Sequence, residues 1–168
     1  TLDWEAVIDA CPWLLPLEGV AQDPTHHAEG DVQTHTGMVA AALTGMSAWR
    51  QLPPEERAGL FIAALMHDIG KRSCTRLDNG RIVSPGHGRA GATLARGLLW
   101  TREGLGAPLD LTRRESIAAM VRTPATTGVP SGSPATWFAL RSWTSGTTST
   151  STAPGSRAEC QSITARLA

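Results

Sequence analysis

The sequence predicts an all-α domain over residues 1–122, followed by an irregular Ser/Thr-rich segment over residues 123–168. Apolar residues recur at helical spacing in the first part, and no series of alternating apolar and polar residues indicates a larger sheet. Residues 123–158 contain 16 Ser or Thr and no acidic residue. Because such a segment cannot bury enough apolar surface to offset its chain entropy, we expect it to form no packed core element.

The N-terminal elements follow from turn and cap signals. Residues 1–22 are rich in Trp, Leu and Pro and predict a short helix followed by a packed turn, and residues 23–30 predict a loop. Asp31 is placed to cap a helix that runs to about Met46. The predicted buried stripe of this helix contains His35 and five apolar residues: Met38, Val39, Ala42, Leu43 and Met46.

A second long helix begins at Pro53-Pro54, since proline is tolerated in a first helical turn. It is apolar on all sides from Leu60 to Met66, which predicts a central, buried helix. Gly70 is expected to end it. A hairpin is predicted around Asp78-Asn79-Gly80, within a loop over residues 72–86.

Two further helices complete the domain. The first covers residues 86–100, with an expected inward face of five residues: His87, Ala90, Gly91, Leu94 and Leu98. Thr112 and Glu115 have capping-box spacing for the second. Its expected inward residues are Ile117, Met120 and Val121.

Composition excludes several classes of protein. Lys+Arg 15 balances Asp+Glu 15, so bulk positive charge does not indicate DNA binding. The longest apolar run, Leu60 to Met66, is too short to cross a membrane, and no signal peptide is visible. The three cysteines are odd in number and widely spaced, so a reducing cytoplasm is expected. The chain begins with Thr1 rather than Met, which is expected of a fragment.

The strongest chemical signal is His67-Asp68 at the end of the buried helix. Burying an imidazole and a carboxylate is costly unless each has a partner, and a divalent cation is a partner that suits both. The alternative is that Asp68 only orients His67 or caps the next turn. However, His35 and His87 also lie on predicted inward faces, which favours convergence on one interior point. Lys71, the only lysine, lies three residues after Asp68 and could hold a phosphate oxygen there.

Three segments carry a family resemblance: THHAEGDVQTHT (25–36), ALMHDIGK (64–71) and SPGHGRAGATLA (84–95). Over about residues 12–122 the chain resembles the HD superfamily of metal-dependent phosphohydrolases. It is most similar in appearance to the HD domains associated with tRNA nucleotidyltransferases. The resemblance implies an HD-type helical bundle with a divalent metal, for which Mg, Mn, Ni, Co, Fe and Zn are candidates.

The resemblance also implies roles for individual residues. His35, His67 and Asp68 correspond to metal ligands, and His87 to a residue near the site that holds phosphate or a second metal. As catalytic groups, Asp68 is expected to orient the attacking water and Lys71 to neutralise substrate charge. The implied substrate is a phosphorylated small molecule, a nucleotide or an RNA end.

Other residues near these motifs are weaker candidates. His26, His27 and Glu29 match the family's loop, where they line the cleft or only stabilise the loop; His27 is the candidate for substrate binding. Arg72 belongs to an Arg-rich stretch over residues 71–89 that suits a phosphorylated substrate, the alternative being an ordinary solvated loop. Cys74 has no CxxC partner and is interpreted as structural or incidental.

The chain departs from the family at its C-terminal end. The family pattern has a late Asp ligand, whereas no Asp follows Asp110 here. Two function classes therefore stay open: a metal-dependent phosphohydrolase, or a degenerate, non-catalytic HD-like domain that acts as a binding module. The segment from Thr123 to residue 158 is either a natural tail or an out-of-frame reading of the family's last helices, since xAC and xTC codons read one base late become Thr and Ser codons.

Overall fold

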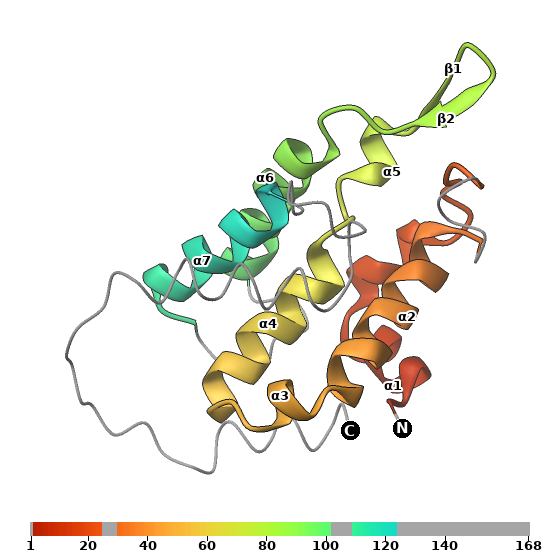
Figure 1. Ribbon diagram of the computed structural model, residues 1–168. Coiled ribbons are helices and arrows are strands. Elements are labelled where there is room, and N and C mark those ends of the chain that lie inside the picture. The colour runs from red at the N-terminus through yellow and green to blue at the C-terminus, as the bar shows by residue number, and fades with distance from the viewer. Residues whose placement is uncertain (1, 25–29, 102–108, 124–168) are drawn as a thin grey trace.

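Helix α4 (Pro54–Met66) runs through the middle of the structure, with α2 (Val32–Gly45) on one side and α6 (His87–Thr101) and α7 (Leu111–Arg122) on the other (Figure 1). The computed structural model describes residues 2–24, 30–101 and 109–123. Within these ranges the all-α prediction is confirmed, because the sheet consists of one short hairpin. No helix in them is both long and apolar enough to cross a membrane.

The central position of α4 follows from its sequence. Every residue from Leu60 to Met66 is buried, as predicted from the uninterrupted apolar run. The helix begins at Pro54 with Glu55 and Glu56 in its first turn, where their charges are favourable for the helix dipole. The helix therefore begins at the surface and ends in the core.

The N-terminal elements cover one side of the core. Helix α1 (Trp4–Ala10) and the 3₁₀ helix η1 (Pro12–Leu17) form the predicted helix and packed turn. They bury Val7, Leu14 and Leu17 almost completely. Short helix α3 (Ser47–Arg50) then connects α2 to α4.

Helix α2 begins as predicted, but its buried face is rotated from the expected one. Asp31 is the N-cap and accepts a hydrogen bond from Thr34 N at 2.8 Å. Met38 is 55% exposed and Ala42 is also exposed, so these two predictions were wrong. The actual buried residues are Val32, His35, Thr36, Val39, Ala40 and Leu43. Small and polar residues complete this face, which is why large apolar residues alone misplaced it.

The predicted hairpin is present after short helix α5 (Lys71–Cys74) and projects from the helical body (Figure 1). Strands β1 (Arg76–Asp78) and β2 (Arg81–Val83) are antiparallel, with Asp78 opposite Arg81. Asn79 and Gly80 both have positive φ, 50° and 78°, as a type I′ turn requires.

For each of helices α6 and α7, one prediction was wrong. On α6 the buried residues are Gly88, Gly91, Ala92, Ala95 and Leu99, whereas Leu94 is 44% exposed. On α7, Asp110 rather than Thr112 is the N-cap, and it accepts from Arg113 N at 2.8 Å.

The inward residues predicted for α7 are confirmed, since Ile117, Met120 and Val121 are buried. The Ser/Thr-rich segment after Thr123 lies outside the described residues, so the division into 1–122 and 123–168 stays a prediction.

Candidate metal centre

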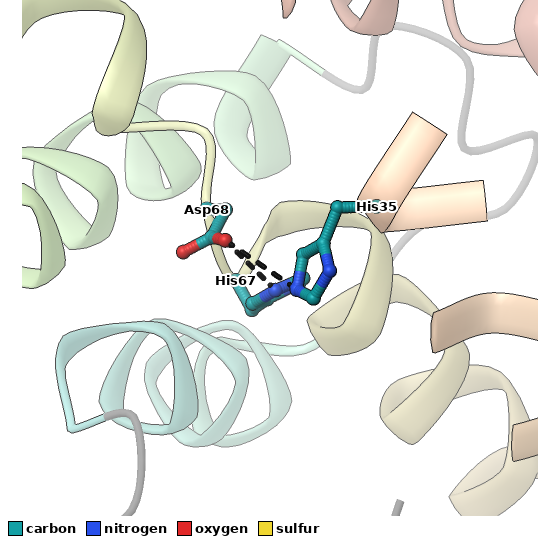
Figure 2. A group of neighbouring side chains, drawn as sticks. All are labelled: His35, His67 and Asp68. Atoms are coloured by element: carbon teal, nitrogen blue, oxygen red, sulfur yellow. Dashed lines mark ion pairs between the residues drawn. The ribbon is translucent and has the colours of Figure 1, made fainter. Parts of the chain in front are cut away.

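Two histidines and an aspartate from two segments of the chain, helix α2 and the turn after α4, lie close together in the core. His35 lies on the buried face of α2, while His67 and Asp68 follow directly after the last residue of α4. All three are buried, and one donor atom from each lies within 4.8 Å of the others. Figure 2 shows their side chains pointing toward one another.

The turn after α4 depends on a close approach to α6. A Cβ on Gly70 would overlap the His87 carbonyl oxygen and would lie 2.5 Å from Gly91 N. Gly70 has an αR backbone, and α4 ends before it, at Met66, rather than at Gly70 as expected. Its function in the fold is to let the His67–Lys71 turn pack against α6, which also carries His87 to the site.

Both core histidines face the same carboxylate oxygen. His67 Nε2 lies 3.1 Å from Asp68 Oδ2, and His35 Nε2 lies 3.8 Å from it (Figure 2). The two imidazole centroids are 5.4 Å apart. Donors that share a first-row cation at 2.0–2.3 Å lie roughly 3–4 Å apart for angles between 90° and 120°. Two of the three donor pairs lie in this range and the third is within 4.8 Å, so the three side chains are close enough to share one small cation.

The hydrogen bonding of His67 supports this fit. Its Nδ1 lies 2.7 Å from the carbonyl oxygen of Ala64. A carbonyl oxygen only accepts, so Nδ1 is the donor. This leaves Nε2, 3.1 Å from Asp68 Oδ2, as the ring nitrogen that can bind either a proton shared with that oxygen or a cation. A backbone carbonyl on the other ring nitrogen is the usual support of a ligating histidine.

Lys71 is the nearest positive charge to this cluster. Its Nζ lies 2.7 Å from Asp68 Oδ2, and its side chain is largely buried. Burial raises the pKa of the Asp68 carboxyl, but the charges and hydrogen bonds of His67 and Lys71 outweigh this and hold it well below its usual range. Asp68 is therefore ionised at neutral pH.

His87 approaches the other oxygen of the same carboxylate. Its Nε2 lies 3.6 Å from Asp68 Oδ1, and its Nδ1 is 2.7 Å from the Ser84 carbonyl oxygen. By the same reasoning as for His67, Nδ1 donates and Nε2 faces the carboxylate. The His87 side chain is 26% exposed, against 5% for Asp68, so His87 is the most exposed of the side chains placed around this carboxylate.

The other predicted site residues are less closely associated. Arg72 follows Lys71 on α5 and is exposed, and Cys74 is partly exposed at the end of the same helix. His26, His27 and Glu29 lie outside the described residues. Within the part of the chain that is described, the cluster of metal-type donors contains His35, His67 and Asp68.

Gln22 is a site residue that sequence reasoning missed. Its Oε1 accepts a hydrogen bond from Lys71 Nζ at 2.6 Å, and its Nε2 donates to the Asp31 carbonyl oxygen at 3.2 Å. Gln22 is buried although it lies between a loop and a turn. Nothing in the local sequence indicates this contact, which joins residues 49 positions apart.

Comparison with known proteins yields one partial similarity. The chain is 40% identical over 87 residues to the Multifunctional CCA protein of Halorhodospira halophila (strain DSM 244 / SL1). The matched region is 49% of this chain and 19% of that protein, so the chain spans about a fifth of its relative. No family model matches, and no solved structure matches significantly.

Proposed function

We propose that this domain is a metal-dependent phosphohydrolase that cleaves a phosphomonoester or phosphodiester on a nucleotide or an RNA end. The observation that carries the proposal is the buried convergence of His35, His67 and Asp68, with one donor atom of each within 4.8 Å of the others. Two imidazole nitrogens and one carboxylate oxygen form a donor set that suits Mn, Fe, Co, Ni or Zn better than Mg.

The residues of the chain have separable functions in this proposal. A bound divalent cation lowers the pKa of water and stabilises negative charge on phosphoryl oxygens. Asp68 and the two core histidines are the residues that would hold the cation, and a metal with three protein ligands can also bind water and substrate. Lys71 supplies positive charge beside Asp68, and His87, the most exposed of these side chains, is placed to contact the substrate phosphate.

The surroundings of His87 suit an anionic substrate. Exposed arginines lie on α5, on the hairpin and on the first turn of α6: Arg72, Arg76, Arg81 and Arg89. Asp78 is the only acidic residue between residues 71 and 89. Arg81 pairs at 3.3 Å with Asp23. The partial similarity to a CCA protein supports a nucleotide- or RNA-related substrate.

The test combines metal content with hydrolysis. Purified protein is loaded with Mn²⁺, Co²⁺, Ni²⁺ or Zn²⁺ and assayed on p-nitrophenyl phosphate, bis-p-nitrophenyl phosphate, mononucleotides and a phosphorylated oligoribonucleotide. Asp68→Ala is expected to abolish turnover, and Lys71→Ala mainly to raise KM. Asp78→Ala, an exposed carboxylate on the hairpin, is the matched control and should behave like wild type. Undiminished turnover in Asp68→Ala would show that the activity arises elsewhere.

A second candidate function is a non-catalytic binding module. It is favoured by the absence of any Asp after Asp110 in the sequence, which removes the late ligand of the family pattern. Loss of an anionic ligand weakens metal affinity. Stoichiometric metal binding without hydrolysis of any of the phosphoesters would support this candidate over the first.

A further inference from the structure

The only lysine of the chain occupies the carboxylate oxygen that both core histidines face. Lys71 Nζ lies 2.7 Å from Asp68 Oδ2, the same atom that is 3.1 Å from His67 Nε2 and 3.8 Å from His35 Nε2. A buried carboxylate requires a positive partner. In this structure the Lys71 ammonium supplies that charge.

Gln22 determines where the ammonium is held. Its Oε1 accepts from Nζ at 2.6 Å, and its own amide group donates to the Asp31 carbonyl oxygen at the start of α2. Asp31 is in turn fixed by Gly19 N and Thr34 N, each 2.8 Å from one of its carboxylate oxygens. Lys71 therefore has a second, rigidly mounted acceptor besides Asp68.

Resting on the metal site proposed above, we infer that Lys71 is an internal counter-cation that exchanges with the metal. In the metal-free protein the ammonium neutralises Asp68. A divalent cation held by Asp68 and the histidines would add its charge to that of the Lys71 ammonium at one buried carboxylate, where repulsion is strong because little water screens it. Lys71 then leaves Oδ2, remains tethered to Gln22, and makes its charge available to an anionic substrate.

This arrangement differs from a permanent ion pair in the sign of its effect on metal affinity. A permanent Lys71–Asp68 pair that orients the ligand supports metal binding, so its removal weakens binding. An exchanging counter-cation competes with the metal, so its removal strengthens metal binding. Its removal also lowers the stability of the metal-free protein, so that metal then stabilises the fold by a larger amount.

The first experiment uses the fact that Lys71 is the only lysine. Full-length protein labelled with lysine carrying ¹⁵N at Nζ gives one ammonium signal by NMR, which is followed during titration with diamagnetic Zn²⁺. The signal is expected to shift and to exchange faster with water, saturating at the stoichiometry at which Zn²⁺ binds. An unchanged Lys71 signal in protein that binds Zn²⁺ would overturn the inference.

The second experiment compares Lys71→Met with Arg72→Met, its exposed neighbour on α5. Lys71→Met is expected to bind Zn²⁺ at least tenfold more tightly than wild type. Its melting temperature should be lower without metal and should rise more on Zn²⁺ saturation, whereas Arg72→Met should match wild type. Equal or weaker Zn²⁺ affinity in Lys71→Met refutes the exchange. The NMR titration decides the matter if this variant does not fold.

Failure of this inference is distinguishable from failure of the metal site. If His35→Ala does not reduce Zn²⁺ binding by wild-type protein, the site itself is wrong and the exchange falls with it. If His35→Ala removes binding but Lys71 does not respond, the metal site stands and only the exchange is refuted.

Discussion

Substitution of Gly70 by alanine should be unusually destabilising for a change of one methyl group. The added Cβ would overlap the His87 carbonyl oxygen, and would lie 2.5 Å from Gly91 N and 3.0 Å from Gly91 Cα. Every one of these neighbours is a backbone atom, so none can move away by a change of rotamer. The His67–Lys71 turn and α6 must therefore separate.

The magnitude follows from the cost of overpacking. Extra methyl groups in well-packed interiors cost about 1–3 kcal/mol, and the rigid surroundings of Gly70 place it at the upper end, at about 3 kcal/mol. That corresponds to a fall of roughly 10 °C in Tm. The separation should also move His87 away from Asp68, which it approaches to 3.6 Å, and so reduce metal affinity.

Other glycines of the chain provide a graded control. A Cβ added at Gly91 would lie 3.1 Å from Cγ1 of the Val121 side chain, which can adjust by a small movement. Gly91→Ala should therefore cost less stability than Gly70→Ala. Gly59 in α4 and Gly97 in α6 have no atom within 4 Å of an added Cβ. Their replacement by alanine should stabilise the protein by about 0.5–1 kcal/mol, because alanine loses less backbone entropy in a helix.

The assay is urea unfolding followed by circular dichroism, with metal affinity measured in parallel. The expected order of stability is Gly59→Ala and Gly97→Ala above wild type, then Gly91→Ala, then Gly70→Ala. A Gly70→Ala variant as stable as wild type would show that the turn and α6 are not in the close contact described, and the reasoning for the placement of His87 would fail with it.

Three further outcomes are expected. Asp31→Ala should lower the free energy of unfolding by about 1 kcal/mol at pH 7 through loss of the α2 N-cap. Partial burial raises the pKa of Asp31, but backbone hydrogen bonds outweigh it and lower the pKa overall. The stability that the Asp31 carboxylate contributes is therefore present above the ordinary carboxyl pKa and is lost as pH falls through the lowered value. Urea melts at pH 7 and at pH 3 measure this difference, and an equal cost at both would contradict it. Burial raises the pKa of the Cys11 thiol to about 11, so Cys11 should resist iodoacetamide at pH 8 in the folded protein while the partly exposed Cys74 reacts, as peptide mapping would show. Glu115→Gln should change stability by less than about 1 kcal/mol, since the Arg96–Glu115 pair is exposed, and a larger effect that persists in 1 M salt would refute this.

Much of the fold is determined by interactions close in sequence. The N-cap at Asp31, the start at Pro54, the apolar run to Met66 and the Asn79-Gly80 turn each depend on a few neighbouring residues, and all are present as predicted. Helix periodicity also placed His35 on a buried face. Such features can be recognised in a single sequence because their energies depend on local backbone geometry and on burial.

Features that depend on contacts between distant segments could not be derived in this way. The rotation of α6, with glycine and alanine rather than Leu94 turned inward, depends on how closely α6 packs against the Gly70 turn and α7. Likewise, the capping-box spacing at Thr112 was overridden by Asp110, which starts α7 two residues earlier than expected. Local patterns define which residues can form a cap or a face, but the packing partner selects among them.

The same distinction between local and long-range interactions applies to the candidate site. The sequence determined that His67 and Asp68 end a buried helix and that a histidine on another helix faces inward. Only the tertiary structure decided that His35, His67 and Lys71 share one oxygen of Asp68, that His87 faces the other, and that Gln22 holds the lysine. The physical reason is that direction and distance between side chains on different helices are fixed by helix packing, which no residue spacing along the chain encodes.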